Sequence, residues 1–363
     1  MENIISYINN YGHRPFDDLD FNEVDSLILS QLVYSDIKYV AETLGDPFYI
    51  RDLASSEIVE EMTKITWFPE NDIKLIDLLS KSERYRDLKI SDVLECEDIE
   101  SEGQITACLI GLGNKKNLII FRGTDASFTG WVESFSFSFE EEVPAQRTGK
   151  NYLIMVAEKY EGSILLAGHS KGGNLVAFAA STVDKEIQDR IERVYDLDGP
   201  GFLDEFFQRE DYRDISEKVS LYIPKKSVVG ILLNNLGETM VVKGKGAIID
   251  QHYPYNWSIK DSKFEIIPET AAISKITKNS LDKWLKTLDR DSRKELILST
   301  YKLFEYSGAE DVKELVDKKI SGLLMLKDSY SNMEDKDAKI LKNSIFDFLS
   351  YLRESFFSYL FKR

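Results

Sequence analysis

The chain has 363 residues, of which 43% are hydrophobic, so it can bury a large core in one big domain or in a domain with an appendage. Its formal net charge of −17 disfavours contact with nucleic acid and with anionic membrane surfaces, because both are themselves negatively charged. We therefore expect no nucleic-acid partner and no stable membrane association.

The sequence also carries signals about its compartment. Residues 1–7 lack a basic patch followed by an apolar stretch, and no apolar run reaches transmembrane length. The two cysteines, Cys96 and Cys108, suit a reducing compartment better than a disulfide framework. These features predict a cytoplasmic protein. Metal-ligand spacing, a phosphate-binding loop and a dinucleotide fingerprint are missing from the sequence, so we expect no metal and no cofactor.

The N-terminal part of the chain predicts helices. Residues 22–32 have the apolar periodicity of a helix, and Asn22 is placed to cap it. The apolar residues that share one face of this helix are Val24, Leu27, Ile28 and Leu32. We expect this face to pack on a sheet. Residues 50–91 predict further helices, with the clearest periodicity at residues 73–79.

A pair of strands follows, at residues 105–110 and 117–124, joined by a turn. The second strand is continuously apolar, which is typical of a central strand buried on both faces. It ends in Gly123 and Thr124, where we expect a loop at the carboxyl edge of the sheet. The backbone N–H of Thr124, with its hydroxyl as a further donor, is a candidate for an oxyanion hole. A tight turn without function is the alternative.

Phenylalanine and serine alternate between residues 134 and 139. This alternation predicts an extended segment with one apolar face, formed by Phe135, Phe137 and Phe139. The three rings are candidates for the lining of an acyl pocket, with ordinary core packing as the alternative.

The chain is organised around Gly168-His169-Ser170-Lys171-Gly172, which follows a short apolar run and precedes a small-residue segment of helical character. Strand, tight turn and helix in this order are typical of a nucleophile elbow, whose glycines leave room for a serine in an unfavourable backbone conformation. We predict that Ser170 is a nucleophile and that the backbone N–H of Lys171 stabilises an oxyanion. The alternative is a glycine-rich turn without chemistry.

A serine nucleophile needs a neighbouring base, usually histidine, and the sequence has three histidines. His169 lies inside the elbow, where we expect its side chain to point away from Ser170. His13 lies ahead of every predicted sheet element. His252 lies in a proline-containing loop downstream of the last strands, in the chain order serine, acid, histidine. We therefore predict that His252 is the base.

The acid of the triad has two carboxylate candidates. Asp198 ends the predicted strand of residues 191–197, at the edge of a parallel sheet where catalytic groups collect. The next strand is followed by no carboxylate until Glu238. Asp250 is the second candidate, and a His252 oriented by solvent or by an amide is the third arrangement.

Two motifs are similar to those of class 3 lipases, namely Phe121-Arg122-Gly123-Thr124 and Gly168-His169-Ser170-Lys171-Gly172-Gly173. Over most of its length the chain resembles, more specifically, the Mbeg1-like family of proteins related to α/β-hydrolases. Further motifs that carry this resemblance are Asn22-Glu23-Val24-Asp25-Ser26, Asp198-Gly199-Pro200-Gly201-Phe202, Ser227-Val228-Val229-Gly230 and Gln251-His252 followed by Trp257. The resemblance implies an α/β-hydrolase fold with a mostly parallel central sheet, and Ser170 and His252 as catalytic candidates.

The chain departs from class 3 lipases at one catalytic position. Where those enzymes have Asp-x-Val-Pro after a strand, this chain has Ser227-Val228-Val229-Gly230. The usual lipase acid is therefore missing. Its absence favours Asp198 as the acid and leaves a weakened or lost activity as the alternative.

Long amphipathic helices dominate the C-terminal part of the chain. They are predicted at residues 281–288, 292–306 and 335–361. We predict an α/β-hydrolase-like core with N-terminal helices over residues 1–261, and a helical region packed on it over residues 262–363. The last helix carries an apolar stripe of Ile345, Phe348, Leu349, Leu352, Phe356 and Tyr359. We expect this stripe to dock onto the body, with membrane or partner docking as the alternative.

These features together predict a serine hydrolase that cleaves an acyl ester, as esterases and lipases do, through an acyl-enzyme on Ser170. The expected partner is a small acyl substrate of apolar character. Thioesterase and peptidase chemistry use the same triad and stay open. The rival from another class is a non-catalytic binding module that keeps the fold. The oligomeric state is not predicted.

Overall fold

The computed structural model describes residues 2–98, 103–125, 127–209 and 212–361. Within these residues, nine strands form one mixed sheet in the order β1-β2-β3-β4-β5-β6-β7-β8-β11. The strands from β4 to β8 are parallel to one another, and antiparallel strands flank them on both sides. The strand bounds are β1 (Phe48–Tyr49), β2 (Lys89–Asp98), β3 (Gly103–Gly113), β4 (Lys116–Phe121), β5 (Ser163–His169), β6 (Ile191–Leu197), β7 (Val219–Pro224), β8 (Glu238–Val242) and β11 (Ile266–Ile267), with β9 (Ile259–Lys260) and β10 (Lys263–Phe264) forming a separate pair.

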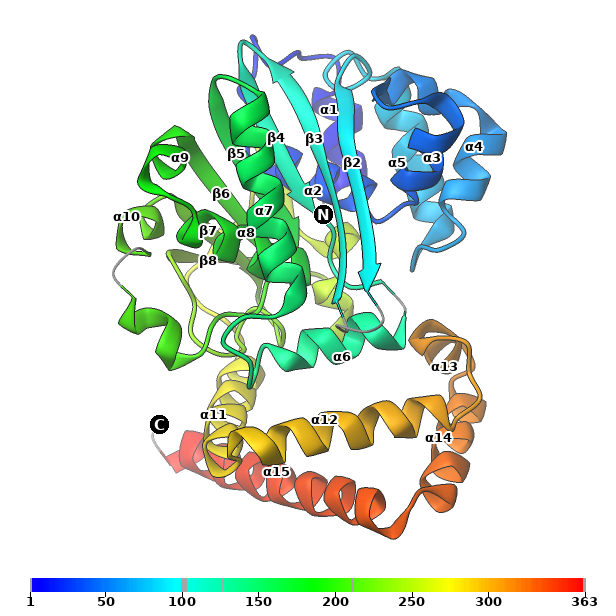
Figure 1. Ribbon diagram of the computed structural model, residues 1–363, viewed down its shortest axis with the longest axis vertical. Helices are drawn as coiled ribbons and strands as arrows, with labels where there is room; N and C mark the ends of the chain where they lie inside the picture. The colour runs from blue at the N-terminus through cyan, green and yellow to red at the C-terminus, as the bar shows by residue number, and fades with distance from the viewer. Residues whose placement is uncertain (1, 99–102, 126, 210–211, 362–363) are drawn as a thin grey trace.

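The parallel strands follow one another in both sequence and space. Right-handed crossovers between such strands place their connecting helices on the same face of the sheet. The helices α7 (Pro144–Lys159) and α8 (Lys171–Thr182) accordingly lie against each other over one face (Figure 1). Between them and the sheet lies a core that includes Phe121, Leu166 and Val176. This topology confirms the predicted α/β-hydrolase fold with a parallel centre.

The opposite face of the sheet has to be covered by helices from outside the parallel stretch. The N-terminal helices α1 (Ile4–Tyr11) and α2 (Glu23–Leu32) do this, and α2 lies against β4, β5 and β6 (Figure 1). The predicted cap is confirmed, because the Asn22 side chain accepts a hydrogen bond from the Val24 backbone at 2.8 Å. The other helices of this part are η1 (Ile50–Ala54), α3 (Ile37–Leu44), α4 (Ser56–Met62) and α5 (Pro69–Lys81).

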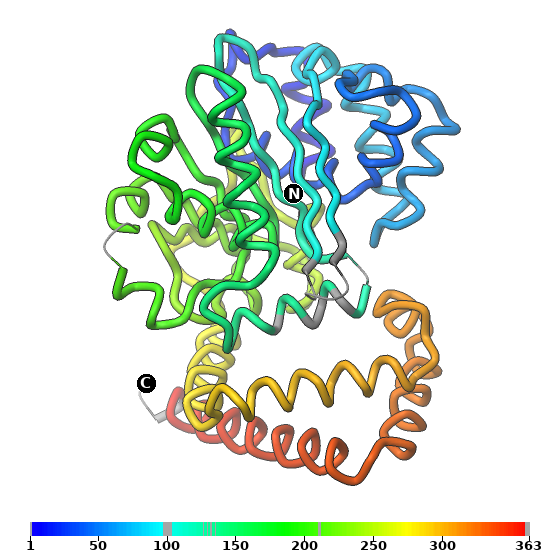
Figure 2. The backbone as a smooth tube through the Cα atoms, viewed as in Figure 1, coloured from blue at the N-terminus to red at the C-terminus, as the bar shows by residue number. Residues whose placement is uncertain are grey.

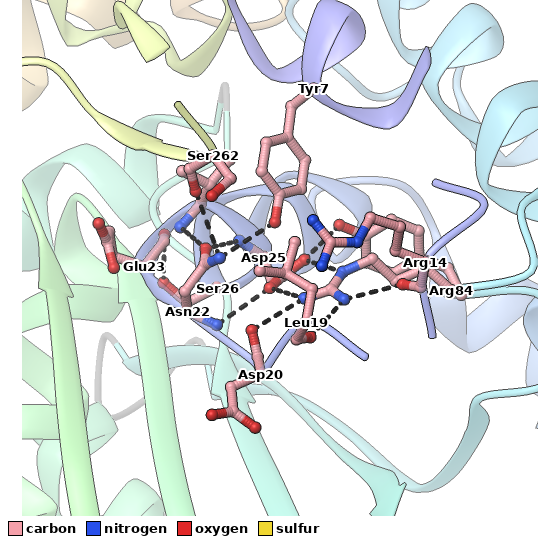
Figure 3. A network of polar contacts seen from close by, with 12 residues as sticks. Tyr7, Arg14, Leu19, Asp20, Asn22, Glu23, Asp25, Ser26, Arg84 and Ser262 are labelled. Carbon is pink, nitrogen blue, oxygen red and sulfur yellow. Dashed lines mark hydrogen bonds and ion pairs between the residues drawn. The ribbon is translucent and has the colours of Figure 1, made fainter. Parts of the chain in front are cut away.

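A buried ion pair anchors the segment that leads into α2 (Figure 3). The Arg84 guanidinium donates to both carboxylate oxygens of Asp25, at 2.8 and 2.5 Å. Its remaining N–H groups donate to the backbone carbonyls of Arg14, Leu19 and Asp20. All five donors of the guanidinium therefore have an acceptor, which is the condition under which a buried charge is tolerated.

Residues 128–136 form a helix, α6 (Phe128–Ser136), so the prediction of an extended segment here is wrong. Side-chain oxygens start this helix. Asp125 accepts from the backbone of Ser127 at 2.9 Å, and the Ser127 hydroxyl accepts from Gly130 at 3.1 Å. Phe137 and Phe139 follow in a turn, and both are buried. The side chain of Phe135 lies outside the described part of the structure.

The C-terminal helices form a layer next to α6 (Figure 2). Here α15 lies against α11 and α12, and α12 contacts α6. The ring of Phe128 on α6 stacks on Phe304 of α12, with centroids 5.5 Å apart. A division of the chain near residue 261 stays a prediction. The helices of this layer are α11 (Ala272–Thr287), α12 (Arg290–Glu305), α13 (Val312–Asp317), α14 (Ile320–Asn332) and α15 (Asp335–Phe361).

Only part of the predicted apolar stripe on α15 is covered. Ile345, Leu349 and Phe356 are 57%, 52% and 48% exposed, whereas Ser344 and Ser355 are buried. The covered face is displaced by one residue along the helix, which corresponds to a rotation of about 100°. Periodicity indicates that a stripe exists, but the partner surface decides which neighbouring face is covered. In the described ranges, no helix is both long and apolar enough to span a membrane.

Candidate functional site

Ser170 lies at the sharp junction between β5 and α8 and has φ 57° and ψ −128°. A positive φ in a residue other than glycine costs on the order of 1–3 kcal/mol and persists only where the surroundings enforce it. The close packing of this turn leaves no room beside the serine. A Cβ on Gly168 would lie 2.2 Å from the carbonyl oxygen of Gly172, and a Cβ on Gly172 would lie 2.1 Å from that of Phe121. Both flanking positions therefore require glycine.

Asp198 follows β6 directly, and the structure brings it to His252. The Asp198 carboxylate lies 2.6 Å from Nδ1 of His252, which therefore carries the proton and donates it. This leaves Nε2 of His252 free to accept a proton. The backbone N–H of Ser170 donates to the carbonyl of Leu197 at 2.9 Å, so the elbow lies beside the strand that ends in Asp198. The Ser170 hydroxyl makes no hydrogen bond within the described part of the chain.

The second carboxylate candidate is engaged elsewhere. Asp250 accepts a hydrogen bond from the backbone of Ala247 at 2.8 Å, and so closes its own loop. Of the two carboxylates considered, the structure places Asp198 on the imidazole of His252.

Ser227, which stands where class 3 lipases have their acid, belongs to the site. Its hydroxyl and the backbone N–H of Gly230 both donate to Oδ1 of Asp198, at 2.5 and 3.0 Å. Asp198 is fully buried, and these donors satisfy the carboxylate oxygen that does not bind the imidazole. The motif that lacks the lipase acid thus holds the carboxylate that lies one strand earlier. The signal was present in the sequence, since a serine stands where an aspartate was expected.

Of the two candidate oxyanion residues, Lys171 belongs to the elbow and Thr124 belongs to a loop that lies close to it. Lys171 is the first residue of α8, where backbone N–H groups have no partner within the helix. The loop of Thr124 approaches the elbow closely, because a Cβ on the preceding Gly123 would lie 2.6 Å from the carbonyl oxygen of His169. The Thr124 hydroxyl is hydrogen-bonded to the hydroxyl of Ser134 on α6 at 2.6 Å.

The side chain of Lys171 forms a buried ion pair that was not predicted. Its ammonium contacts the carboxylate of Glu133 on α6 and donates to the carbonyl of Gln104 at 2.6 Å. Glu133 also accepts from the backbones of Gln104 and Ala145, both at 3.1 Å. Burial lowers the pKa of Lys171, and the attraction of Glu133 opposes this shift. The signal in the sequence was a charged residue, Lys171, directly after the predicted nucleophile.

Asp196 is a further buried carboxyl close to the site. It lies on β6 two residues before Asp198 and accepts the backbone N–H of Gly199 at 2.9 Å. Burial is the main cause that raises its pKa from 3.8 to about 8, and the neighbouring Asp198 adds to the shift. Asp196 is therefore largely protonated at neutral pH.

Two cavities lie near α8 and α6. Phe137 lines one of about 150 Å³ together with Phe202, Phe206 and Asn174 of α8. Phe139 lines another of about 340 Å³ between the body and the C-terminal helices. Ser170 and His252 are in neither wall. In the ranges that the structure describes, no group of three or more His, Cys, Asp or Glu side chains could hold a metal ion.

Comparisons with known proteins give one strong match. No curated protein matches the chain. The crystal structure of M37 lipase overlaps it with a TM-score of 0.40 at 16% identity, over 59% of this chain and 70% of that one. That overlap is too weak to carry an argument. The family model described as Mbeg1-like matches residues 79–302, which is more than half of the chain and includes the elbow, Asp198 and His252. The chain therefore belongs to the Mbeg1-like family.

Proposed function

We propose that the protein is a serine hydrolase that cleaves acyl esters through an acyl-enzyme on Ser170. One observation carries the proposal. A serine in a strained backbone conformation lies beside a buried aspartate that holds a histidine by its Nδ1. Strain of this kind has no structural benefit of its own, and a fully satisfied buried carboxylate on an imidazole is the arrangement that a general base needs.

In the proposed reaction, the Ser170 hydroxyl attacks the ester carbonyl, and Nε2 of His252 takes its proton. Asp198 keeps the imidazole in the Nδ1–H tautomer and stabilises the imidazolium that forms. The tetrahedral intermediate collapses with cleavage of the bond to the leaving alcohol, which receives the proton from His252. Water then attacks the acyl-enzyme with the same proton transfers in reverse, which releases the acid and restores Ser170.

The negative charge on the carbonyl oxygen needs preorganised donors. We assign this role to the backbone N–H groups of Thr124 and Lys171. The place of Lys171 directly after Ser170 and the close approach of the Thr124 loop to the elbow support the assignment.

We propose an apolar acyl group as the substrate class. Phe137, Phe202 and Phe206 in the wall of the cavity beside α8 support this, and the same wall also carries Glu140, Glu141, Glu205 and Arg209. Each buried methylene contributes about 0.8 kcal/mol, so kcat/KM should rise with acyl length over short esters. A flat dependence would point to a small polar acyl group, and a parallel series of thioesters would separate thioesterase from esterase chemistry. A cytoplasmic location stays our expectation.

Labelling with a fluorophosphonate tests the proposal, since its phosphorus mimics the tetrahedral intermediate on an activated serine. We expect the label on Ser170, none in Ser170→Ala, and a steep loss in His252→Ala. His13→Ala is the matched control, because His13 is exposed and should label as the wild type does. A folded wild-type protein that takes up no label between pH 6 and 9, with and without detergent, would favour the non-catalytic binding module instead.

A further inference from the structure

We infer that His169, the histidine inside the elbow, is a positioning residue that holds the base His252 in place. The inference rests on the proposed function. From the sequence we expected only that the ring of His169 points away from Ser170. The inference adds a role for that ring. Three contacts of this buried ring carry the inference.

The first contact is a hydrogen bond to the backbone of His252. Nε2 of His169 lies 2.9 Å from the carbonyl oxygen of His252. A carbonyl oxygen only accepts, so Nε2 of His169 must carry the proton. His252 is the last residue of a short turn, η3 (Ile249–His252), whose neighbouring Gln251 is held by Trp257 and Lys226, while His169 binds the carbonyl of His252 itself.

The second contact sets the tautomer of His169. Its Nδ1 lies 2.9 Å from the hydroxyl of Tyr34. Burial, together with the neighbouring His252, holds the pKa of His169 well below 6.5, so the ring is neutral and has one proton. With that proton on Nε2, Nδ1 accepts from Tyr34. Burial raises the pKa of Tyr34, which keeps its hydroxyl protonated and able to donate. The chain of donors runs from Tyr34 through His169 to the carbonyl of His252.

The third contact is between the two imidazole rings. Their centroids are 4.6 Å apart, and their planes are inclined by 34°. In the proposed mechanism His252 becomes positively charged when it takes the proton of Ser170. A charged neighbour at this distance would oppose that step, whereas a neutral ring does not. The same ring that holds the backbone of His252 therefore also restricts its side chain without disfavouring the imidazolium.

In the proposed mechanism a base from a distant loop has to be held at the nucleophile, and these contacts hold His252 to the elbow. Asp198 fixes one edge of the His252 ring, and His169 fixes its backbone and one face. Because His169 is covalently bonded to Ser170, the holder of the base and the nucleophile belong to one dipeptide. Any shift of the elbow relative to the loop of residues 249–256 has to break the bond between His169 and His252.

Two substitutions separate the contributions of His169. His169→Phe keeps an aromatic ring and removes the donor, while His169→Gln keeps an amide donor and removes the ring. Loss of alignment between base and nucleophile costs up to about 100-fold in rate, so we expect kcat to fall by about 10- to 100-fold in His169→Phe with little change in KM. We expect His169→Gln to recover part of that loss. Tyr34→Phe should have the smallest effect on kcat, because it removes only the donor to Nδ1 that fixes the tautomer of His169. His13→Phe, on the exposed histidine, is the control and should match the wild type.

Nitrogen NMR of a protein labelled at its three histidines gives a readout that needs no catalysis. In the inactive Ser170→Ala background we expect His169 to be neutral with its proton on Nε2 from pH 5 to 8. We expect His252 to be held as the Nδ1–H tautomer, and adding His169→Phe should convert it to a mixture of tautomers.

The outcomes distinguish this inference from the proposed function. A wild-type protein without fluorophosphonate labelling contradicts the hydrolase, while the NMR comparison still decides whether His169 orders His252. If His169→Phe is folded and keeps both the wild-type kcat and a single His252 tautomer, His169 is no positioning residue. If His169→Phe does not fold, the other two variants decide. Unchanged kcat in both His169→Gln and Tyr34→Phe, together with a His169 that carries its proton on Nδ1 in the Ser170→Ala protein, overturns the inference.

Discussion

Two buried ion pairs of this protein differ in how completely their charges are satisfied. In the pair of Arg84 and Asp25, both side chains are fully buried and every N–H of the guanidinium has an acceptor (Figure 3). In the pair of Lys171 and Glu133, the ammonium has two acceptors in the described structure, one of them a backbone carbonyl. The first pair ties the N-terminal segment together, and the second joins the elbow to α6.

The difference between the two ion pairs indicates that one belongs to the scaffold and the other to the candidate site. A planar guanidinium stays charged and fixes several chain segments at once, whereas a buried ammonium readily changes its pKa. Burial lowers the pKa of both groups, but the hydrogen bonds and the charge of Asp25 outweigh it and raise the pKa of Arg84, whereas burial prevails over Glu133 and lowers the pKa of Lys171. We therefore expect Arg84 to act in stability, whereas the contacts of Lys171 with Glu133 and of Thr124 with Ser134 join the candidate oxyanion residues to α6.

The largest expected effect is a loss of catalysis when the candidate site is changed. Asp198→Asn should lower kcat by about 10⁴-fold, because an amide favours the wrong tautomer of the base. The amide oxygen can still accept from Ser227 and Gly230, so we expect the unfolding midpoint in urea to stay close to that of the wild type. Steady-state hydrolysis of a short ester measures the first quantity. Full activity in Asp198→Asn combined with loss in Asp250→Asn would transfer the acid to Asp250.

A scaffold substitution should have the opposite profile. Arg84→Met leaves Asp25 buried without its partner and should lower the free energy of unfolding by about 3–5 kcal/mol. The folded fraction should keep its rate of fluorophosphonate labelling per folded molecule. Urea unfolding followed by circular dichroism measures the loss. A normal stability with an impaired labelling rate would show that the N-terminal pair serves the site.

Glu133→Gln should affect both stability and activity. It removes the charge that balances Lys171, and we expect a loss of about 1–3 kcal/mol in the free energy of unfolding together with a lower kcat. In Glu133→Gln with Lys171→Met, neither charge of this pair remains, so stability should return in part. If stability falls while kcat is unchanged, the pair of Lys171 and Glu133 is a scaffold like the pair of Arg84 and Asp25.

A change in the pH dependence of stability is expected at Asp196. Because the pKa of Asp196 is raised to about 8, the folded protein keeps a proton that the unfolded chain releases above pH 4. The contribution of Asp196 to stability is therefore full at low pH and falls by up to about 1.4 kcal/mol per pH unit until pH 8. Asp196→Asn should remove this slope, so its stability relative to the wild type should grow from pH 5 to 8. Equal slopes in both proteins would mean that Asp196 is ionised in the fold.

Much of the fold follows from local pattern. The apolar run, the glycines and the small residues around Ser170 predict strand, turn and helix, and the structure has all three. The contact of Asp198 with His252 was predicted by elimination among few candidates, and the structure places the two side chains together. Their roles in catalysis stay predictions.

Features that depend on distant partners could not be predicted in this way. The alternation of phenylalanine and serine fits a strand, but residues 128–136 form a helix that is capped by Ser127. This helix carries Glu133 to its buried donors. The contact of Glu133 with Lys171 joins residues 38 positions apart, and no local period reveals it. Which face of α15 is covered likewise depends on its contacts with α11 and α12, so the sequence of α15 alone does not reveal it.

The most direct measurement is detection of the acyl-enzyme itself. The folded protein is mixed with a p-nitrophenyl ester of medium chain length, quenched in acid within the first turnovers, and analysed by intact mass and peptide mapping. We expect one acyl group per molecule on Ser170 in the wild type, none in Ser170→Ala, and much slower formation in His252→Ala and Asp198→Asn. Ester hydrolysis without any adduct on Ser170, or an adduct that forms equally fast without His252, would contradict the proposed nucleophile and base.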